Sequence, residues 1–246
     1  MDRIAIITGG SKGLGQALVN IYANNGYRVF SIARSKADVE NKNITQFQTD
    51  LGEISKIEKS FLAIMKLIDK KSTKKITLIN NAGMIGDIKP HDKVKLSAIE
   101  QTINLNVTAP LMLDALFVDY LRDWTCDKAI INISSGAANN AIASWSTYCS
   151  SKAALQMHTK VMALEQAEID NGAKIVAIAP GVVDTNMQVE IRSSAKEDFK
   201  DLDRFIALKE ENNLLSSEEV GAIIFNADKN GKLSNGDITN VNELKE

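Results

Sequence analysis

The chain has few of the residues that proteins use for cross-links, metal centres or flexible linkers. Its two cysteines, Cys126 and Cys149, provide neither a disulfide framework nor the spacing of a metal site. The two histidines, His91 and His158, have no matching ligand partners, so we expect packing or surface roles for them and no bound metal. Prolines number three, and no Pro/Gly-rich linker or internal repeat divides the chain, so we expect a single domain over residues 1–246.

The chain also lacks a strong charge of either sign and a long apolar run. A formal net charge of -2 gives no reason to expect nucleic acid or an anionic membrane as a partner. No stretch approaches the ~18 consecutive apolar residues of a membrane span, and the first residues contain no signal-peptide core. We therefore expect a soluble, cytoplasmic protein.

What the chain does contain is a regular alternation of strand-like and helix-like segments. The strand-like runs are short, apolar and rich in β-branched residues, which is typical of strands buried on both faces of a parallel sheet. They cover residues 3–8, 27–33, 44–47, 76–80, 129–133, 174–179 and 237–241. Helical periodicity fills residues 14–24, 55–68, 98–121, 147–168 and 218–227. This order predicts an α/β fold with a doubly wound parallel sheet flanked by helices.

Residues 185–217 interrupt the alternation. The segment is highly charged, contains no clear strand and follows a Pro-Gly turn. A long excursion between two sheet elements often forms a lid over a site, and a solvated pair of surface helices is the alternative.

A glycine-rich turn connects the first strand to the first helix. Gly9, Gly13 and Gly15 have the spacing Gly-x-x-x-Gly-x-Gly rather than the commoner Gly-x-Gly-x-x-Gly. Glycines allow a tight turn and a close backbone approach to a pyrophosphate, and the N-terminus of the following helix attracts its negative charge. The turn therefore predicts a dinucleotide site.

The end of the second strand indicates which dinucleotide binds. An acidic residue there would select NAD by contacting the ribose 2′-hydroxyl. This strand instead ends at Arg34, and Lys12 lies within the glycine turn, so two cations are available for the 2′-phosphate of NADPH. Asp38 lies close enough in sequence to complicate this reading, and a simple surface role for Arg34 is the alternative.

The candidate catalytic residues lie in the middle of the chain. Tyr148 and Lys152 are four residues apart and would share one face of a helix, and Ser135 lies thirteen residues upstream. Placed there, Lys152 would favour the phenolate of Tyr148 and lower its pKa, while Ser135 would hold a substrate oxygen. This set predicts acid–base chemistry at a carbonyl or alcohol, although a Tyr-x-x-x-Lys pair by itself is common on amphipathic helices.

Taken together, these motifs resemble the short-chain dehydrogenase/reductase family over essentially the whole chain. The matching strings are Thr-Gly-Gly-Ser-Lys-Gly-Leu-Gly at residues 8–15, Asp50-Leu51, Asn-Asn-Ala-Gly at residues 80–83, Asn106, Ser135, Tyr148, Lys152, Pro180-Gly181 and Thr185. The resemblance implies a single-domain Rossmann-like fold and a catalytic tetrad of Asn106, Ser135, Tyr148 and Lys152. Asn106 would position a water molecule that links Lys152 to solvent.

The same resemblance implies the residues that bind the cofactor and the substrate. For NADPH they are Gly9, Ser11, Lys12, Gly13, Leu14, Gly15, Arg34, Asp50, Leu51, Asn81, Ala82, Gly83, Tyr148, Lys152, Pro180, Gly181, Val183, Thr185 and Met187. For a small carbonyl substrate they are Ser135, Trp145, Tyr148 and Gly181. It also implies a homodimer, or a tetramer, formed through the long helices predicted at residues 98–121 and 147–168, with packing of both helices within one subunit as the alternative.

Within the family, the chain is most similar to sepiapterin reductases and their bacterial relatives, including benzil reductases that form (S)-benzoin. One departure concerns Asn240, which stands where sepiapterin reductases carry an aspartate that anchors the pterin. We therefore expect reduction of a ketone or a benzil-type 1,2-dicarbonyl by NADPH, with pterin reduction as the alternative. Two further classes, a non-catalytic nucleotide sensor and an NAD-dependent alcohol dehydrogenase, fit the intact tetrad and the two cations less well.

Overall fold

The computed structural model describes residues 2–245, and its centre is one parallel sheet of seven strands in the order β3-β2-β1-β4-β5-β6-β7. The strands are β1 (Asp2–Thr8), β2 (Arg28–Ala33), β3 (Ile44–Gln48), β4 (Thr73–Asn80), β5 (Asp127–Ile133), β6 (Lys174–Ala179) and β7 (Ile238–Asn240). Each strand-like run of the sequence forms a strand, so the predicted α/β fold with a doubly wound sheet is confirmed. β1 pairs with β2 on one side and with β4 on the other, so the chain winds outward in two directions from β1 and β4.

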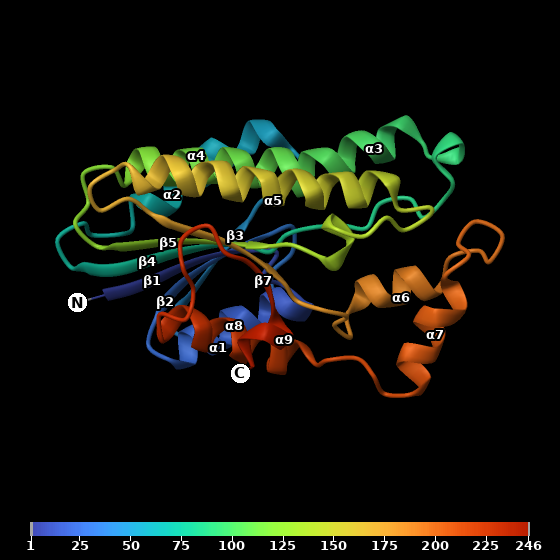
Figure 1. Ribbon diagram of the computed structural model, residues 1–246. Coiled ribbons are helices and arrows are strands. Elements are labelled where there is room, and N and C mark those ends of the chain that lie inside the picture. Colours follow the sequence, from blue (N-terminus) through green and yellow to red (C-terminus); the bar gives the residue numbers. More distant parts are fainter. Residues whose placement is uncertain (1, 246) are drawn as a thin grey trace.

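Helices cover both faces of the sheet (Figure 1). One layer contains α2 (Ile57–Met65), α3 (Leu96–Ile103), α4 (Ala109–Tyr120) and α5 (Ser146–Ala167), and the other contains α1 (Gly13–Asn24), α8 (Ser217–Lys229) and α9 (Val241–Leu244). Residues of β1 alternate between two cores: Ile4 and Ile6 belong to the first, and Ala5 and Ile7 to the second. A strand between two helix layers needs apolar residues at every position, which explains the uninterrupted apolar runs of the sequence.

The predicted helix at residues 98–121 is not one regular helix. A π-helical segment, Asn104–Thr108, separates α3 from α4. Pro110 has no backbone N–H to donate to the carbonyl of Asn106 four residues earlier, and regular α-helical hydrogen bonding therefore cannot pass through this point. The irregular turn places Asn106 in the interior, where the residue is 1% exposed.

Residues 185–217 form two helices, α6 (Asn186–Arg192) and α7 (Leu202–Glu210), which stand apart from the helix layers at the carboxyl ends of the strands (Figure 1). Their inner side is apolar, since Ile191, Phe199, Leu202 and Phe205 are buried in a third core with Trp145. The segment is therefore packed on the body of the protein through its inner side. It differs in this respect from a solvated pair of surface helices.

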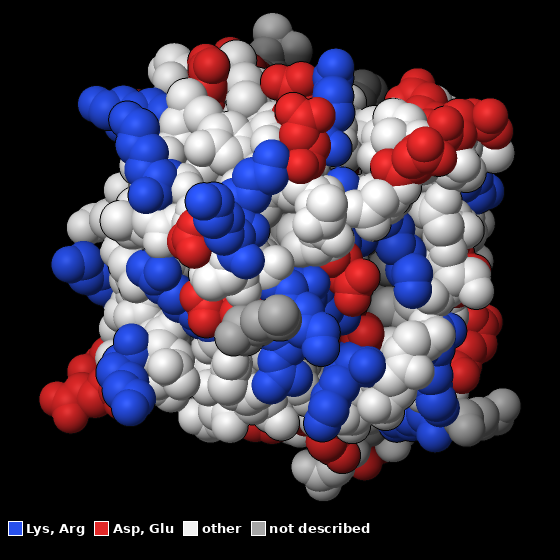
Figure 2. Space-filling model, turned by 90° about the vertical axis from the view of Figure 1, so that its left-hand side faces the viewer, with Lys and Arg blue, Asp and Glu red and all other residues white. Residues whose placement is uncertain are grey.

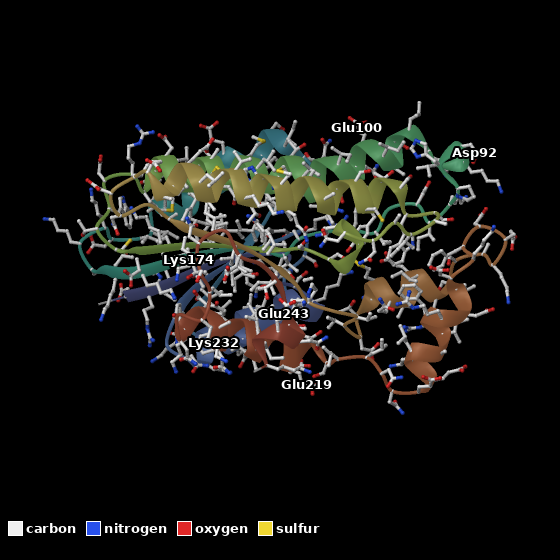
Figure 3. The ribbon with its side chains drawn as sticks, viewed as in Figure 1. Asp92, Glu100, Lys174, Glu219, Lys232 and Glu243 are labelled. Atoms are coloured by element: carbon white, nitrogen blue, oxygen red, sulfur yellow. The ribbon has the colours of Figure 1, made fainter. Side chains whose placement is uncertain are left out.

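The opposite face of the molecule, at the amino ends of the strands, displays many Lys and Arg side chains with acidic residues between them (Figure 2). Cations of β2, β4 and β5 make contacts within the fold: Arg28 donates to the carbonyl of Leu67, Lys128 to that of Leu121, and Lys75 pairs with Asp228 at 2.8 Å. Charged side chains also point outward along the helix layers (Figure 3). No helix within residues 2–245 is both long and apolar enough to cross a membrane.

Candidate active site

A cavity of about 980 Å³ opens at the carboxyl ends of the strands, where β1 and β4 lead their chains in opposite directions. In an open α/β sheet this switch point is the usual place for a ligand. Every residue predicted to bind cofactor or substrate lines this cavity. Of the four predicted tetrad residues, Ser135, Tyr148 and Lys152 line it and Asn106 lies behind its wall.

The glycine turn has the geometry that its sequence predicts. Gly9 and Gly13 have φ angles of 68° and 54°, a region that favours glycine. A Cβ atom on Gly15 would collide with the carbonyl oxygen of Gly9, and one on Gly13 would lie 3.2 Å from the Thr185 methyl group. The turn therefore needs glycine for close packing, and it lies directly beside the start of α6.

Hydrogen bonds fasten this turn to the end of β4. The Thr8 hydroxyl oxygen accepts the backbone N–H groups of Asn81, at 3.0 Å, and Ala82, at 2.9 Å. In return, the Asn81 amide donates to the carbonyl of Thr8 at 2.9 Å. The Asn-Asn-Ala-Gly string thus closes the base of the cavity and holds two neighbouring strand ends together.

The far end of the cavity is basic and rich in hydroxyl groups. Lys12 and Arg34 are exposed at its edge, and the hydroxyls of Ser11 and Ser35 lie 3.2 Å apart between them. Ser35 was not among the predicted residues, although its position next to Arg34 could have indicated it. Two cations and two hydroxyls in one corner are a suitable set of partners for a phosphate group.

The predicted catalytic side chains meet at the other end. Tyr148 and Lys152 are 7% and 5% exposed, and the Lys152 ammonium lies 5.9 Å from the centre of the Tyr148 ring. Lys152 Nζ donates to the carbonyl of Ile133 at 2.8 Å. Ser134 and Ser135 follow β5 and both line the cavity, and Ser134 accepts a hydrogen bond from Gln156. Ser135 is the member of the pair that hydrogen-bonds with Tyr148.

Burial shifts both titrating groups toward their neutral forms. Desolvation raises the pKa of the Tyr148 phenol, and a hydrogen bond with Ser135 only partly offsets this effect. Desolvation lowers the pKa of Lys152 to about 8. The pKa of Tyr148 is thus raised rather than lowered as expected, because burial disfavours the phenolate.

Asn106 is held by the backbone rather than by the cavity. Its amide accepts from the N–H of Met84 at 2.9 Å and donates to the Met84 carbonyl at 2.8 Å and to the Ser151 hydroxyl at 3.1 Å. A Cβ atom on Gly83 would lie 3.4 Å from the Asn106 oxygen and 3.6 Å from Lys152 Nζ, so Gly83 lies between the two residues. Lys152 and Asn106 are therefore near neighbours without a direct hydrogen bond.

An aromatic cluster forms the wall beside Tyr148. The Trp145 ring lies edge-on to Tyr148 with 5.7 Å between ring centres, and stacks on Phe199 at 5.5 Å with an angle of 15° between the planes. Phe205 packs against the same indole at 5.3 Å and lines the cavity. The two phenylalanines were not predicted, because charged residues surround them in the sequence. Val189, in the same segment, is 52% exposed.

Asn240 lies at the end of β7 and lines the cavity. Its side-chain oxygen accepts the backbone N–H groups of Asn242 and Glu243, and the Glu243 carboxylate reaches back to the N–H of Asn240. This reciprocal capping of α9 occurs where Glu243 is labelled in Figure 3. The oxygen of Asn240 is thus already used within the fold, which leaves its NH₂ group for a ligand.

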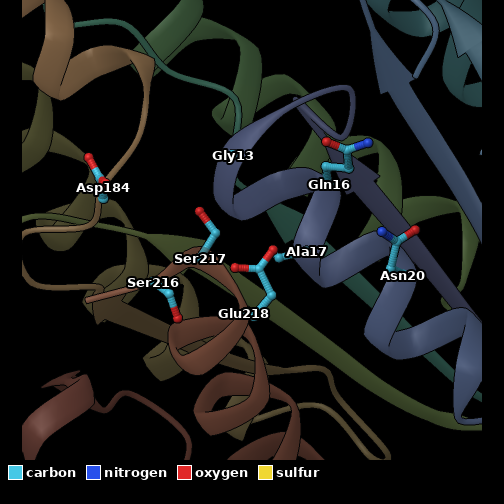
Figure 4. Close-up of a pocket in the computed structure, with 8 residues that line it drawn as sticks. All are labelled: Gly13, Gln16, Ala17, Asn20, Asp184, Ser216, Ser217 and Glu218. Carbon is cyan, nitrogen blue, oxygen red and sulfur yellow. The ribbon is translucent and has the colours of Figure 1, made fainter. Parts of the chain in front are cut away.

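A second cavity of about 470 Å³ lies on the other side of the glycine turn, between α1 and the start of α8 (Figure 4). Its polar lining includes Gln16, Asn20, Asp184 and Glu218. Lys209 already pairs with Asp184 at 2.6 Å, and no group of three or more potential metal ligands occurs within residues 2–245. The chemistry-bearing residues are therefore those of the larger cavity.

Comparisons with known proteins agree with this geometry. A family model described as short chain dehydrogenase matches residues 3–196. The chain is 40% identical to a benzil reductase ((S)-benzoin forming) of Bacillus cereus, over 98% of this chain and 100% of that protein. It is 27% identical to a sepiapterin reductase of Xenopus tropicalis, over 89% of this chain and 88% of that protein.

Solved structures are similar over nearly the whole chain. A short chain dehydrogenase/reductase from Saccharomyces cerevisiae superposes with a TM-score of 0.85 at 26% identity, covering 98% of this chain and 96% of that one. The structure of ElxO with NADP bound gives a TM-score of 0.80 at 26% identity, covering 98% and 97%.

The burial of Lys152 makes a direct prediction about its titration. Its ammonium should lose a proton near pH 8 rather than near the ordinary lysine value of 10.5. NMR of lysine labelled at the ε-carbon would measure this, with Lys152→Arg assigning the resonance. A Lys152 resonance that titrates together with the other lysines would contradict the prediction.

Proposed function

Since the chain belongs to the short-chain dehydrogenase family, we propose that it is a carbonyl reductase that uses NADPH to reduce a ketone or a 1,2-dicarbonyl. The observation that carries this proposal is the continuity of one cavity, which has the glycine turn at one end and Ser135, Tyr148 and Lys152 at the other. A dinucleotide lying along the glycine turn would have its reactive end beside these side chains. The intact set of acid–base groups argues against a non-catalytic nucleotide sensor.

The residues of the cavity fit a dinucleotide. Gly9 and Gly15 permit the backbone to approach a pyrophosphate, and α1 presents its free N–H groups there. Asp50 and Leu51 would border the adenine, and Pro180, Gly181, Val183, Thr185 and Met187 would border the nicotinamide. When bound, the cofactor supplies the hydride, and the protein supplies binding and orientation.

The choice of NADPH rests on charge. Arg34 and Lys12 would contact the 2′-phosphate, with the hydroxyls of Ser11 and Ser35 as further partners. An enzyme selective for NAD has an acidic residue at this strand end, which accepts a hydrogen bond from the ribose 2′-hydroxyl. Here the strand end carries Arg34 and Ser35, which can both donate to a phosphate. ElxO, a structural neighbour, carries NADP, which supports the same choice.

Acid–base roles follow from burial. Tyr148, whose pKa is raised, stays protonated at neutral pH and gives its proton to the carbonyl oxygen. Ser135 donates a hydrogen bond to the same oxygen and stabilises its developing charge. Lys152, with a pKa of about 8, keeps its ammonium at neutral pH, binds the nicotinamide ribose and returns a proton to Tyr148. A proton donor needs no lowered pKa, so Lys152 need not lower that of Tyr148.

Proton resupply would pass the region of Asn106. The Asn106 carbonyl lacks its usual α-helical donor, because Pro110 has no N–H. A water molecule in this region would lie near Lys152, since the Asn106 side-chain oxygen and Lys152 Nζ both lie close to Gly83. The side chain of Asn106, fully used by Met84 and Ser151, keeps this turn in place.

The substrate that fits best is a bulky, largely apolar dicarbonyl. Ile85, Ile142, Trp145 and Phe205 line the substrate end of the cavity, and such a surface binds by area and shape. Asn240 offers an NH₂ group there, which is a poorer partner than a carboxylate for the amino edge of a pterin. The benzil reductase of Bacillus cereus, 40% identical, supports the same substrate class.

We also propose that residues 185–217 act as a lid and that the protein forms a homodimer. The lid would close on the substrate through the packing of Phe199 and Phe205 against Trp145. For the dimer, Met157, Val161 and Leu164 form an exposed apolar row on α5, with Leu164 73% exposed. Their spacing of four and three residues places them on one helix face, which a second copy would cover.

Tyr148→Phe should abolish most of the reduction and leave NADPH binding nearly unchanged. The substitution removes the proton donor and keeps the ring that packs on Trp145, and loss of a general acid typically costs roughly 10²–10⁴-fold. Steady-state kinetics and a fluorescence titration with NADPH measure the two effects. Tyr120→Phe, on the surface of α4, is the matched control, and wild-type kcat in Tyr148→Phe would disprove the assignment.

Arg34→Ala should weaken NADPH binding far more than NADH binding. A charge-assisted bond to phosphate contributes about 1.5–3 kcal/mol, or roughly 10-fold to 150-fold in Kd. The exposed cation Lys36 lies outside the cavity lining, so Lys36→Ala provides the control for a general loss of charge. Equal losses for both cofactors in Arg34→Ala would exclude NADPH selection by this residue.

Benzil and a phenyl-alkyl dione should be reduced with a higher kcat/KM than sepiapterin. In a dione each carbonyl activates the other, and the apolar wall gains contact area with the aryl group. Asn240→Asp preserves an oxygen for capping α9 and should improve sepiapterin turnover without improving that of benzil. Wild-type protein that turns over sepiapterin at least ~10-fold better than both diones would instead establish pterin reduction.

A further inference from the structure

A cluster of buried polar side chains lies beneath the active site, between the sheet and helices α4 and α5. It consists of Asn80 at the end of β4, Asp114 on α4, Asn132 near the end of β5, and His158 and Thr159 on α5. Asp114, Asn132 and Thr159 are each 0% exposed, and Asn80 is 5% exposed. None of these residues has a role in the chemistry proposed above.

The hydrogen bonds of the cluster form a directed chain. Asn80 Nδ2 donates to Asp114 Oδ1 at 2.6 Å and to Asn132 Oδ1 at 2.8 Å. Asn132 Nδ2 then donates to the Thr159 hydroxyl at 3.0 Å, and that hydroxyl donates to the carbonyl of Leu155. The second oxygen of Asp114 lies 3.0 Å from His158 Nε2. Burial raises the pKa of the Asp114 carboxyl, and the hydrogen bonds with His158 and Asn80 partly offset this effect.

The position of Asp114 determines which way the two amides point. A carboxylate only accepts hydrogen bonds, so Asn80 must turn its NH₂ group toward Asp114 and Asn132. A flipped Asn80 would place its oxygen against two other oxygens. The cost of the observed orientation is that Asn80 Oδ1 is buried with no hydrogen-bond partner among the described residues. A buried acceptor left unpaired needs a reason elsewhere in the structure.

These hydrogen bonds end beside the residue that contacts Lys152. Asn132 is followed by Ile133, whose carbonyl accepts the hydrogen bond from Lys152 Nζ at 2.8 Å. Asn80 is followed by Asn81 and Ala82, whose N–H groups bind Thr8 beside the glycine turn. The cluster therefore fixes the last residues of the two strands that hold Lys152 and the base of the cofactor cavity.

We propose that Asp114 is a positioning residue, which acts through Asn80 and Asn132 to hold the Ile133 carbonyl where it receives Lys152. Its effect on reduction rests on the proposed function, whereas its effect on the Lys152–Ile133 contact does not. Asp114 is on α4 and fully buried, and its two oxygens contact Asn80 and His158, so its role is to orient polar groups. A shift of the lysine by a fraction of an ångström would misplace it relative to Tyr148 and the bound ribose.

Asp114→Leu tests this proposal, because it removes both acceptors and replaces the carboxylate with a larger apolar side chain of the same branching. We expect kcat to fall roughly 10-fold to 100-fold, as displaced catalytic groups typically cause, and the Kd for NADPH to rise by much less, because most of the lining that would hold the cofactor lies away from Lys152. Asp114→Asn keeps an oxygen that can face Asn80 and should recover most of kcat. Asp119→Leu, on the exposed surface of the same helix, should match wild type in both quantities.

Thr159→Val is a milder second variant that carries the test if Asp114→Leu does not fold. It takes away the acceptor of Asn132 Nδ2, and kcat should again fall by a larger factor than the Kd for NADPH rises. A crystal structure of either variant should show Lys152 Nζ more than 3.5 Å from the Ile133 carbonyl oxygen, against 2.8 Å here.

These measurements separate the possible failures. Wild-type protein that reduces no carbonyl would overturn the proposed function, while the Lys152–Ile133 distance in the variants would still decide the positioning role. Unchanged kcat and an unchanged distance in both folded variants would overturn the positioning role. Equal losses in kcat and NADPH affinity, without recovery in Asp114→Asn, would reduce Asp114 to a structural residue and also overturn the proposal.

Discussion

The pairing of β1 with β4 is the constraint on which the rest of the structure depends. These strands lie side by side in the sheet although about seventy residues separate them, and their connections leave in opposite directions. The two chains must therefore diverge at their carboxyl ends, and the space between them becomes the cavity. Thr8 spans this point through its hydrogen bonds to Asn81 and Ala82. The glycine turn and the base of the cofactor site are thus held by the same contact.

The proposed chemistry depends on the burial of Tyr148 and Lys152. Desolvation raises the pKa of Tyr148 and lowers that of Lys152, so each group is held closer to its neutral form. A phenol that stays protonated suits proton donation to a carbonyl oxygen. A lysine whose pKa lies near 8 can both carry a charge and release a proton at neutral pH. The fold accommodates the buried ammonium with the Ile133 carbonyl, which explains why the end of β5 must be placed so accurately.

Under the proposed function, substrate preference would arise on the other side of the cavity, where residues 185–217 meet the body. Trp145 lies between Tyr148 and the two phenylalanines of this segment, so its indole contacts both Tyr148 and residues 185–217. Substrates that fill the apolar wall would be held against the same ring that packs on Tyr148. Shape selection and proton transfer would in this way be connected through one side chain.

The sequence by itself determined the order of strands and helices, the glycine turn and the identity of the candidate catalytic residues. These features are local, because each apolar run, the glycine spacing and the Tyr-x-x-x-Lys motif is contained within a few consecutive residues. The break in the helix at Asn106 also has a local cause, the missing N–H of Pro110, although the break was not predicted.

Only the tertiary structure decided the protonation of Tyr148, the apolar inner face of residues 185–217 and the contacts of Asp114. Each depends on groups brought together from distant parts of the chain, because desolvation and hydrogen bonding respond to neighbours in space. Tyr148 is buried by Trp145 and the lid behind it, and Asp114 meets Asn80 and His158 from other elements. The charges of a residue's neighbours in sequence cannot reveal such an environment, and this is why the pKa of Tyr148 was predicted in the wrong direction.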